Sequence, residues 1–108
     1  LEQLLGSARQ SAEPLEQRHR DLAASVQQVY ERLFYGLLEH LARSTGETRL
    51  CLAGGCAMNS LANGRIAERT PFREVWIQPA AGDAGGSLGA AAAVWRQELG
   101  GPKTWVLE

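Results

Sequence analysis

An isolated acidic residue, Asp83, lies within a glycine-rich segment, residues 78–90, whose sequence is QPAAGDAGGSLGA. Glycine lets the backbone turn sharply and approach a ligand with no side chain in the way. The segment leads into an alanine-rich run of helical character, and the free N–H groups at the start of a helix favour anions. A carboxylate at this place can reach a cation beside such an anion, or it can serve only as a helix cap. These residue types predict a site for a phosphate group and a metal ion.

A second glycine pair, Gly54 and Gly55, follows the apolar run at residues 50–53 and again precedes a helical pattern. Ligands of open α/β sheets collect at the carboxyl ends of the strands, where both glycine turns are expected to lie. The two turns therefore predict two edges of one nucleotide pocket. Gly55 is expected to approach the nucleotide with a positive backbone φ angle. The alternative for both turns is structural, because glycine also lets a helix pack closely on a sheet.

A long amphipathic helix is predicted over residues 16–44, because apolar residues recur there at three- and four-residue steps. Thr45 and Gly46 supply its stop signal. Residues 1–15 have a loop-like composition and are expected to lead into the domain as a loop. His19 and His40 lie far apart on the helix and are interpreted as solvated residues rather than ligands. The buried face of the helix is expected to comprise Leu22, Val26, Val29, Leu33, Leu37 and Leu41, widened by Ala23, Tyr30, Phe34 and Leu38.

The rest of the chain alternates predicted strands and helices. A buried strand is predicted at residues 49–53 and a second strand at residues 74–78. A helix is predicted at residues 57–67, with Asn63–Gly64 as a candidate break, and another at residues 84–98. Trp95 and Leu99 are expected to anchor the far end of this last helix.

This order of elements indicates an α/β fold with parallel strands and packed helices. Two strands are few for a free-standing sheet of this type, because both faces need to be covered. Residues 1–108 are therefore interpreted as a single partial domain that completes a larger sheet.

Composition and charge exclude several function classes. Twelve acidic and eleven basic residues give a formal charge of −1, which offers no electrostatic basis for binding nucleic acid or an anionic membrane. No apolar run approaches the ~20 residues that span a bilayer, and the first residues lack the order of a signal peptide. The chain is interpreted as a cytoplasmic piece of a longer polypeptide. Cys51 and Cys56 lack the partners of a zinc site and are predicted to be buried thiols.

Three stretches of the chain together resemble one protein family. They are residues 50–59, with the sequence LCLAGGCAMN, then Asn63–Gly64, and then residues 75–91, which contain the whole glycine-rich segment. They resemble the NodU/CmcH carbamoyltransferases, which are O-carbamoyltransferases of nodulation-factor and antibiotic biosynthesis, and the resemblance extends back through residues 17–27. It implies that this chain is the C-terminal part of the carbamoyltransferase catalytic domain, a partial second lobe of an actin-like ATPase (ASKHA) domain.

The resemblance also implies a reaction and the residues that serve it. In such enzymes ATP and carbamoyl phosphate yield a carbamoyl-adenylate, whose carbamoyl group then passes to an acceptor hydroxyl. The implied ligand of the catalytic divalent metal is Asp83, and the residues implied beside the nucleotide are Gly54, Gly55, Asn59, Gly85 and Gly86. A carboxylate suits Mg(II) and, together with histidines, Fe(II) or Zn(II), so the metal stays open. The family's paired histidines, a further acidic ligand and the acceptor domain are expected in the remainder of the parent polypeptide, and this chain alone is expected to be inactive.

Two alternatives from other function classes remain. The chain can be an ASKHA-type nucleotide-binding lobe that acts as a conformational switch, or a non-catalytic α/β interaction module whose glycines only permit packing. No residue is assigned to covalent catalysis, because Ser60 and Ser87 have no histidine near them in the sequence.

Overall fold

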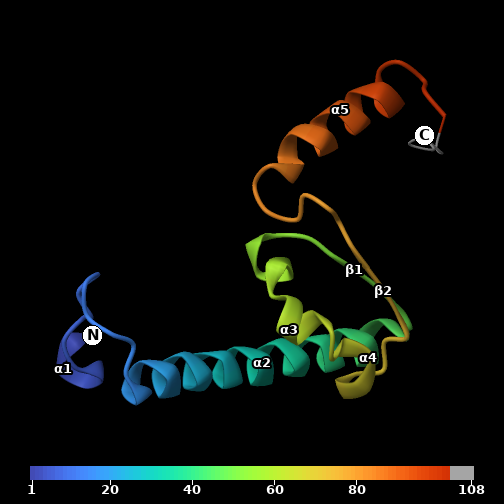
Figure 1. Ribbon diagram of the computed structural model, residues 1–108. Helices are drawn as coiled ribbons and strands as arrows, with labels where there is room; N and C mark the ends of the chain where they lie inside the picture. Colours follow the sequence, from blue (N-terminus) through green and yellow to red (C-terminus); the bar gives the residue numbers. More distant parts are fainter. Residues whose placement is uncertain (103–108) are drawn as a thin grey trace.

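The computed structural model of the protein describes residues 1–102 (Figure 1). Its elements are α1 (Glu2–Leu5), α2 (Gln17–Thr45), β1 (Arg49–Leu52), the 3-10 helix η1 (Gly55–Met58), α3 (Ser60–Asn63), α4 (Ile66–Arg69), β2 (Glu74–Ile77) and α5 (Gly85–Gln97). This order confirms the predicted α/β alternation. The helix predicted over residues 57–67 is instead divided into short pieces, and the candidate break at Asn63–Gly64 separates α3 from α4. None of the helices described is long and apolar enough to cross a membrane.

The segment before α2 contains one helical turn, α1, where a loop was predicted. Glutamate, glutamine and leucine all favour the helical state, and this preference decides the local conformation of residues 2–5. The turn ends at Gly6, whose φ angle is 85°. The Glu2 side chain then accepts a hydrogen bond from the Ala8 N–H at 3.2 Å. The loop prediction is therefore wrong for these residues.

Both ends of α2 lie within one residue of their predicted positions. At the start, the Glu16 N–H donates to Nδ1 of His19 at 3.0 Å. His19 is half-buried and satisfies a backbone donor at the start of the helix, so it is only partly solvated. At the end, Gly46 adopts a left-handed conformation with φ 72°, and its N–H donates to the Ala42 carbonyl at 2.9 Å. This is the glycine stop that the sequence predicted.

The two strands form a parallel pair, as predicted. Arg49 is opposite Glu74 and Leu52 is opposite Ile77, so both strands end at the same edge of the sheet. The crossover between them consists of η1, α3 and α4. Because the segments that follow β1 and β2 leave from that shared edge, the two glycine-rich turns begin side by side.

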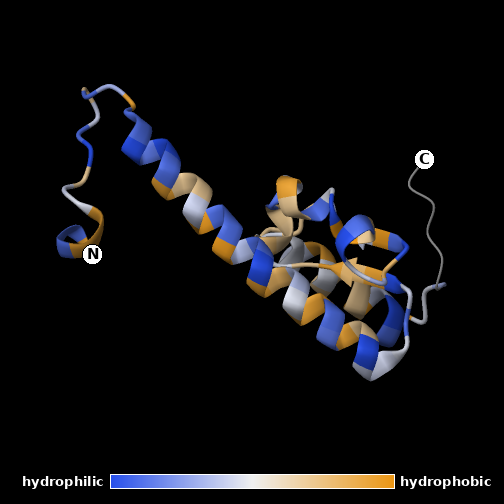
Figure 2. Ribbon diagram, turned by 90° about the horizontal axis from the view of Figure 1, so that it is seen from below, coloured by the Kyte–Doolittle hydropathy of each residue, from blue (hydrophilic) through white to orange (hydrophobic). Residues whose placement is uncertain are grey.

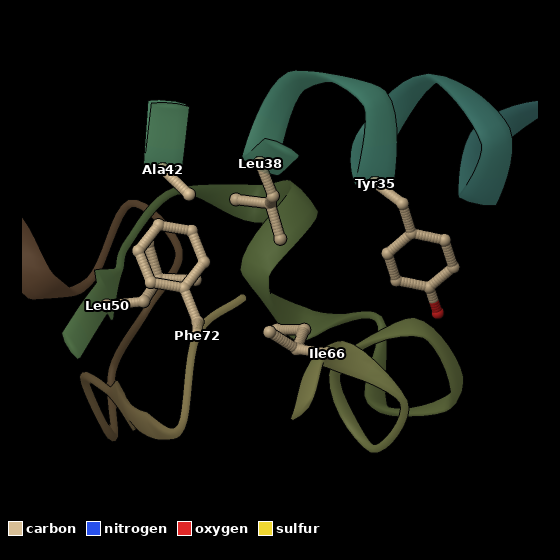
Figure 3. Close-up of a cluster of buried hydrophobic side chains, with 6 residues drawn as sticks. All are labelled: Tyr35, Leu38, Ala42, Leu50, Ile66 and Phe72. Carbon is tan, nitrogen blue, oxygen red and sulfur yellow. The ribbon is translucent and has the colours of Figure 1, made fainter. Parts of the chain in front are cut away.

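The hydrophobic core lies between the C-terminal half of α2, the sheet and the crossover (Figure 3). Ile66 and Phe72 are its two largest fully buried side chains. Burying a side chain of this size stabilises the fold by roughly 1.5–3 kcal/mol. The other members of the cluster are Tyr35, Leu38, Ala42 and Leu50.

The buried face of α2 is only partly the predicted one, because Leu38, expected at its margin, is buried. Leu33 and Leu37, both at the centre of the predicted stripe, are each 65% exposed. The face that packs is the one that carries Tyr35, Leu38 and Ala42. The crossover is short and covers only one side of the C-terminal half of α2, whereas the N-terminal half extends beyond it (Figures 1 and 2). The periodicity of the sequence located the apolar positions of α2 correctly. It could not show which of these positions the crossover would cover.

One face of the sheet is open, which corrects two further predictions. Leu50 is buried and Leu52 packs against the core, whereas Cys51, between them, is exposed on the opposite face. Cys56 is also exposed, so neither thiol is buried. The strand at β1 is covered on one face only, because α2 and the crossover lie on the same side of it.

The last helix, α5, stands apart from α2 (Figure 1). Trp95 and Leu99, the predicted anchors, are 44% and 67% exposed. The radius of gyration is 19.1 Å, well above the ~13 Å of a compact domain of about 100 residues. The prediction that Trp95 and Leu99 anchor the helix is therefore wrong for this chain. No described element packs closely against the far end of α5.

Candidate functional site

The two glycine turns are in direct contact. The Gly54 N–H donates to the Ala81 carbonyl at 2.6 Å, and the Gln78 N–H donates to the Leu52 carbonyl at 3.3 Å. The pairing of β1 with β2 thus continues past the ends of the strands into the turns. This contact confirms that the two turns lie side by side.

A cavity of about 400 Å³ lies between the turns. Gly54 contributes to it from the first turn, and Asp83, Gly85 and Gly86 contribute from the second. An adjoining hollow of about 570 Å³ shares Asp83 and is lined on its other side by Met58. Volumes of 300–1,000 Å³ are typical of small-molecule sites. Four of the six residues predicted for the site therefore line one cavity.

The positions in the two turns differ in whether and why they require glycine. Gly54 has φ 98° and ψ 164°, a conformation essentially restricted to glycine. Gly55 does not have a positive φ angle, so the expectation for this residue is wrong. The positive φ angle is found at its neighbour, Gly54. A side chain at Gly85 would collide with the Ala80 carbonyl oxygen. At Gly55 and Gly86, by contrast, an added Cβ meets no described atom within 4 Å beyond the adjoining backbone of its own helix, so packing within residues 1–102 does not require glycine at either position.

Backbone donors of the turns are already engaged. The Gly85 N–H donates to the Gly82 carbonyl at 3.0 Å, and the Gly86 N–H donates to the Asp83 carbonyl at 3.1 Å. The N–H of Gly54 is bound to Ala81. The N–H groups of these three glycines are therefore engaged within the turns and are not free to bind a ligand.

Asp83 is exposed at the rim of this cavity. The N-cap residue of α5 is Ala84, and no side chain caps the helix. The structural alternative for Asp83, that of a helix cap, is thereby excluded. Among residues 1–102 no group of three or more histidine, cysteine, aspartate or glutamate side chains could hold a metal ion. Asp83 can supply one ligand, and a metal bound there needs further donors.

Asn59 lies beside the first turn but does not line the cavity between the turns. Its Oδ1 accepts from the Ala62 N–H at 3.1 Å, so it caps α3. Its Nδ2 donates to Oε1 of Gln27 at 2.9 Å. Both ends of the Asn59 side chain are therefore bonded to the protein.

A family model described as the carbamoyltransferase N-terminus matches residues 1–92 of the sequence. The match includes both glycine turns and the cavity between them. The chain belongs to the carbamoyltransferase N-terminus family. The sequence-based resemblance is thus confirmed.

Relatives of this carbamoyltransferase segment are much longer than the segment itself. An uncharacterized protein of Synechocystis is 50% identical over 97 residues, which are 89% of this chain and 16% of that protein. Nodulation protein NolO of Bradyrhizobium diazoefficiens is 47% identical over 94 residues, or 87% of this chain and 17% of that protein. Nodulation protein U of Azorhizobium caulinodans is 34% identical over 74 residues, or 66% of this chain and 13% of that protein. The chain thus spans about a sixth of the length of its most similar curated relatives shown here.

Gln78 lines the cavity between the turns but was not among the site residues predicted from the sequence. It lines both the cavity and the adjoining hollow. Within residues 1–102, its Oε1 atom is buried and has no hydrogen-bond partner. A buried amide oxygen without a partner is costly, so this position favours a polar ligand or a bound water. Its place directly after β2, at the carboxyl end of a strand, was the available signal.

Proposed function

We propose that the parent polypeptide is an ATP-dependent O-carbamoyltransferase and that this chain forms part of the second lobe of its ASKHA-type catalytic domain. ATP, carbamoyl phosphate and water would give a carbamoyl-adenylate with release of pyrophosphate and phosphate. The carbamoyl group would then pass to an acceptor hydroxyl with release of AMP. The observation that carries the proposal is the cavity between the turns, to which Gly54, Asp83, Gly85 and Gly86 all contribute. Membership of the carbamoyltransferase N-terminus family supports the transfer chemistry.

The turns are suited to a bulky, charged nucleotide. Gly55 and Gly86 face space that no described atom fills within 4 Å of an added Cβ, so phosphates can come close to the backbone. Gly54 and Gly85 hold the two turns in the required shape. The buried, unpartnered Oε1 atom of Gln78 gives the same cavity an acceptor for a ligand hydroxyl or N–H group.

Asp83 is proposed as one ligand of a divalent metal, with Mg(II), Fe(II) and Zn(II) all compatible with a carboxylate. Its exposed position on the cavity rim and its absence from the cap of α5 fit this role. When bound, the metal would neutralise phosphate charge and polarise the centre under attack. The remaining ligands, the carbamoyl phosphate site and the acceptor site are assigned to the remainder of the parent polypeptide, in the cytoplasm.

The role proposed for Asn59 differs from that of the glycines. Because both ends of its side chain are bonded within the protein, we assign it to the support of the first turn rather than to a side-chain contact with the nucleotide.

A nucleotide-binding switch lobe without transferase activity is the second candidate. It shares the cavity but predicts no carbamoyl product. The space beside Gly55 and Gly86 disfavours the third reading, that of an interaction module whose glycines only permit packing.

The test uses the purified parent polypeptide with ATP and carbamoyl phosphate. We expect release of AMP-containing product and pyrophosphate only when both substrates are present, with the carbamoyl-adenylate detected by mass spectrometry. ATP binding without any carbamoyl product would favour the switch lobe. Absence of ATP binding would leave neither nucleotide proposal standing.

A further inference from the structure

Side-chain hydrogen bonds tie the first glycine turn to α2. Asn59 Nδ2 donates to Gln27 Oε1 at 2.9 Å, and Gln27 Nε2 lies 3.2 Å from Asn59 Oδ1, although the two residues are 32 positions apart. Further along α2, the Tyr30 hydroxyl donates to the Cys56 carbonyl at 3.0 Å. Both contacts hold residues that follow Gly54 and Gly55 closely in the chain.

Independent partners fix the orientation of both amides. Asn59 Oδ1 accepts from the Ala62 N–H at 3.1 Å, and a backbone N–H can only donate. Gln27 Nε2 donates to Glu31 Oε1 at 2.9 Å, and an ionised carboxylate can only accept. With each amide oriented in this way, the Gln27 oxygen and the Asn59 nitrogen face each other as acceptor and donor. The two amide groups are therefore complementary in the orientations that their other hydrogen bonds already require.

The network extends to the far end of α3. Glu31 Oε2 lies 3.2 Å from Arg65 Nη1, and the Glu31 side chain is only 15% exposed. A partly buried ion pair is less screened by salt than an exposed one. Asn59 at the start of α3 and Arg65 after its end are thus both bound to α2, through Gln27 and Glu31.

The turn that is held in this way also holds the second turn. Gly54 donates to Ala81, which lies two residues before Asp83 in the chain. A continuous path of hydrogen bonds and chain segments therefore runs from α2 through Asn59 and the first turn to the segment that carries Asp83. A displacement of the first turn would alter the space in the cavity between the turns.

We propose that Gln27 and Asn59 form a positioning pair that sets the place of the Gly54–Gly55 turn and, through it, the width of the cavity. The proposal rests on the proposed function, because the cavity is taken as the place of ATP. Neither residue lines that cavity, so each acts through the turn and not by touching the nucleotide.

The test replaces Gln27 by methionine in the parent polypeptide, because methionine keeps a similar length but cannot form the pair. Gln28→Met, at the exposed neighbouring position on α2, is the matched control. Loss of these hydrogen bonds is expected to weaken ATP binding about tenfold in calorimetry. The KM for carbamoyl phosphate should stay at the wild-type value. In the control variant, both the Kd for ATP and the KM for carbamoyl phosphate should equal those of the wild type. A merely structural role would lower the active fraction and the thermal midpoint without raising the Kd for ATP.

A second variant separates the pair from the helix cap. Asn59→Ser retains a good N-cap side chain for α3 but cannot reach Gln27 in the same way. It should weaken ATP binding by about the same factor as Gln27→Met, and the double variant should add little to either. If the two substitutions weaken ATP binding independently, so that their factors multiply in the double variant, the positioning role is overturned. An unchanged Kd for ATP in a folded Gln27→Met protein would overturn it as well. Failure of the wild-type parent to bind ATP would instead remove the proposed function itself.

Discussion

The Gly54 N–H and the Ala81 carbonyl form a 2.6 Å hydrogen bond that joins the two glycine turns. Leu52 and Ile77, the last residues of the paired strands, are in register just before these turns. The site is thus a consequence of the sheet: once the strands are parallel, their outgoing segments meet. Changes in the backbone of the first turn should therefore be felt at Asp83.

Gly54→Ala should strain the first turn. With φ 98° and ψ 164°, Gly54 occupies a region that other residues adopt only at a cost of about 1–3 kcal/mol. We expect a lower thermal midpoint of the parent polypeptide and weaker binding of ATP. Gly36→Ala is the matched control, because Gly36 lies within α2 and an added Cβ there meets no described atom within 4 Å beyond the helix's own backbone. Alanine there should raise the midpoint, since it favours a helix by about 1 kcal/mol over glycine. Equal effects of the two changes would refute the conformational role of Gly54.

Gly55→Val should affect the ligand more than the fold. Gly55 has no positive φ angle, and an added Cβ meets no described atom within 4 Å. If ATP approaches this backbone, the branched side chain should weaken its binding about ten- to hundredfold, as overpacking typically does. Isothermal titration with ATP measures the loss, and the thermal midpoint reports on the fold. Wild-type affinity in this variant would show that the nucleotide lies elsewhere.

Tyr35 should contribute a pH-dependent part of the stability. Burial is the main cause that raises the pKa of Tyr35 above its ordinary value of 10.0, and Glu31 also raises it. The folded-state pKa is higher than the unfolded one, so this stabilisation is complete below pH 10.0 and is lost as the pH rises through the folded-state pKa. The hydroxyl also donates to the Ala62 carbonyl at 3.0 Å.

Tyr35→Phe should therefore lower the unfolding free energy by about 1 kcal/mol near neutral pH. The difference between variant and wild type should shrink in alkaline solution, where the wild-type hydroxyl begins to ionise. Chemical unfolding of the parent polypeptide at neutral and alkaline pH measures both effects. A difference that grows with pH would contradict the direction given for this pKa.

Local signals in the sequence predicted the elements well. Gly46 ended α2 at the expected place, and β-branched and aromatic residues located β2. The meeting of the two glycine turns also followed from the sequence, because parallel strands share one edge. Each of these features depends on neighbours in the chain or on a general rule of sheet topology.

Burial was predicted less well, because it depends on what covers a face. Leu33 and Leu37 carry the helical period, yet the crossover packs on the face of Leu38 instead. Cys51 belongs to an apolar strand but lies on its open face. The Gln27–Asn59 pair joins residues 32 positions apart, so no local pattern announces it. Asn59 was predicted as a site residue from the family resemblance, whereas its hydrogen bonds to α2 are visible only in three dimensions.

The most direct test of the account is the metal content and carbamoyl-adenylate formation of the Asp83→Asn parent polypeptide. Asparagine keeps the size of Asp83 but removes the charge, and Asp21→Asn, an exposed position on α2, is the matched control. We expect Asp83→Asn to lose bound metal and to lower product formation at least about a hundredfold, with an unchanged thermal midpoint of the metal-free protein. The control should behave as the wild type. Wild-type product formation with a full complement of metal in Asp83→Asn would contradict the assignment of the cavity between the turns as the reaction site.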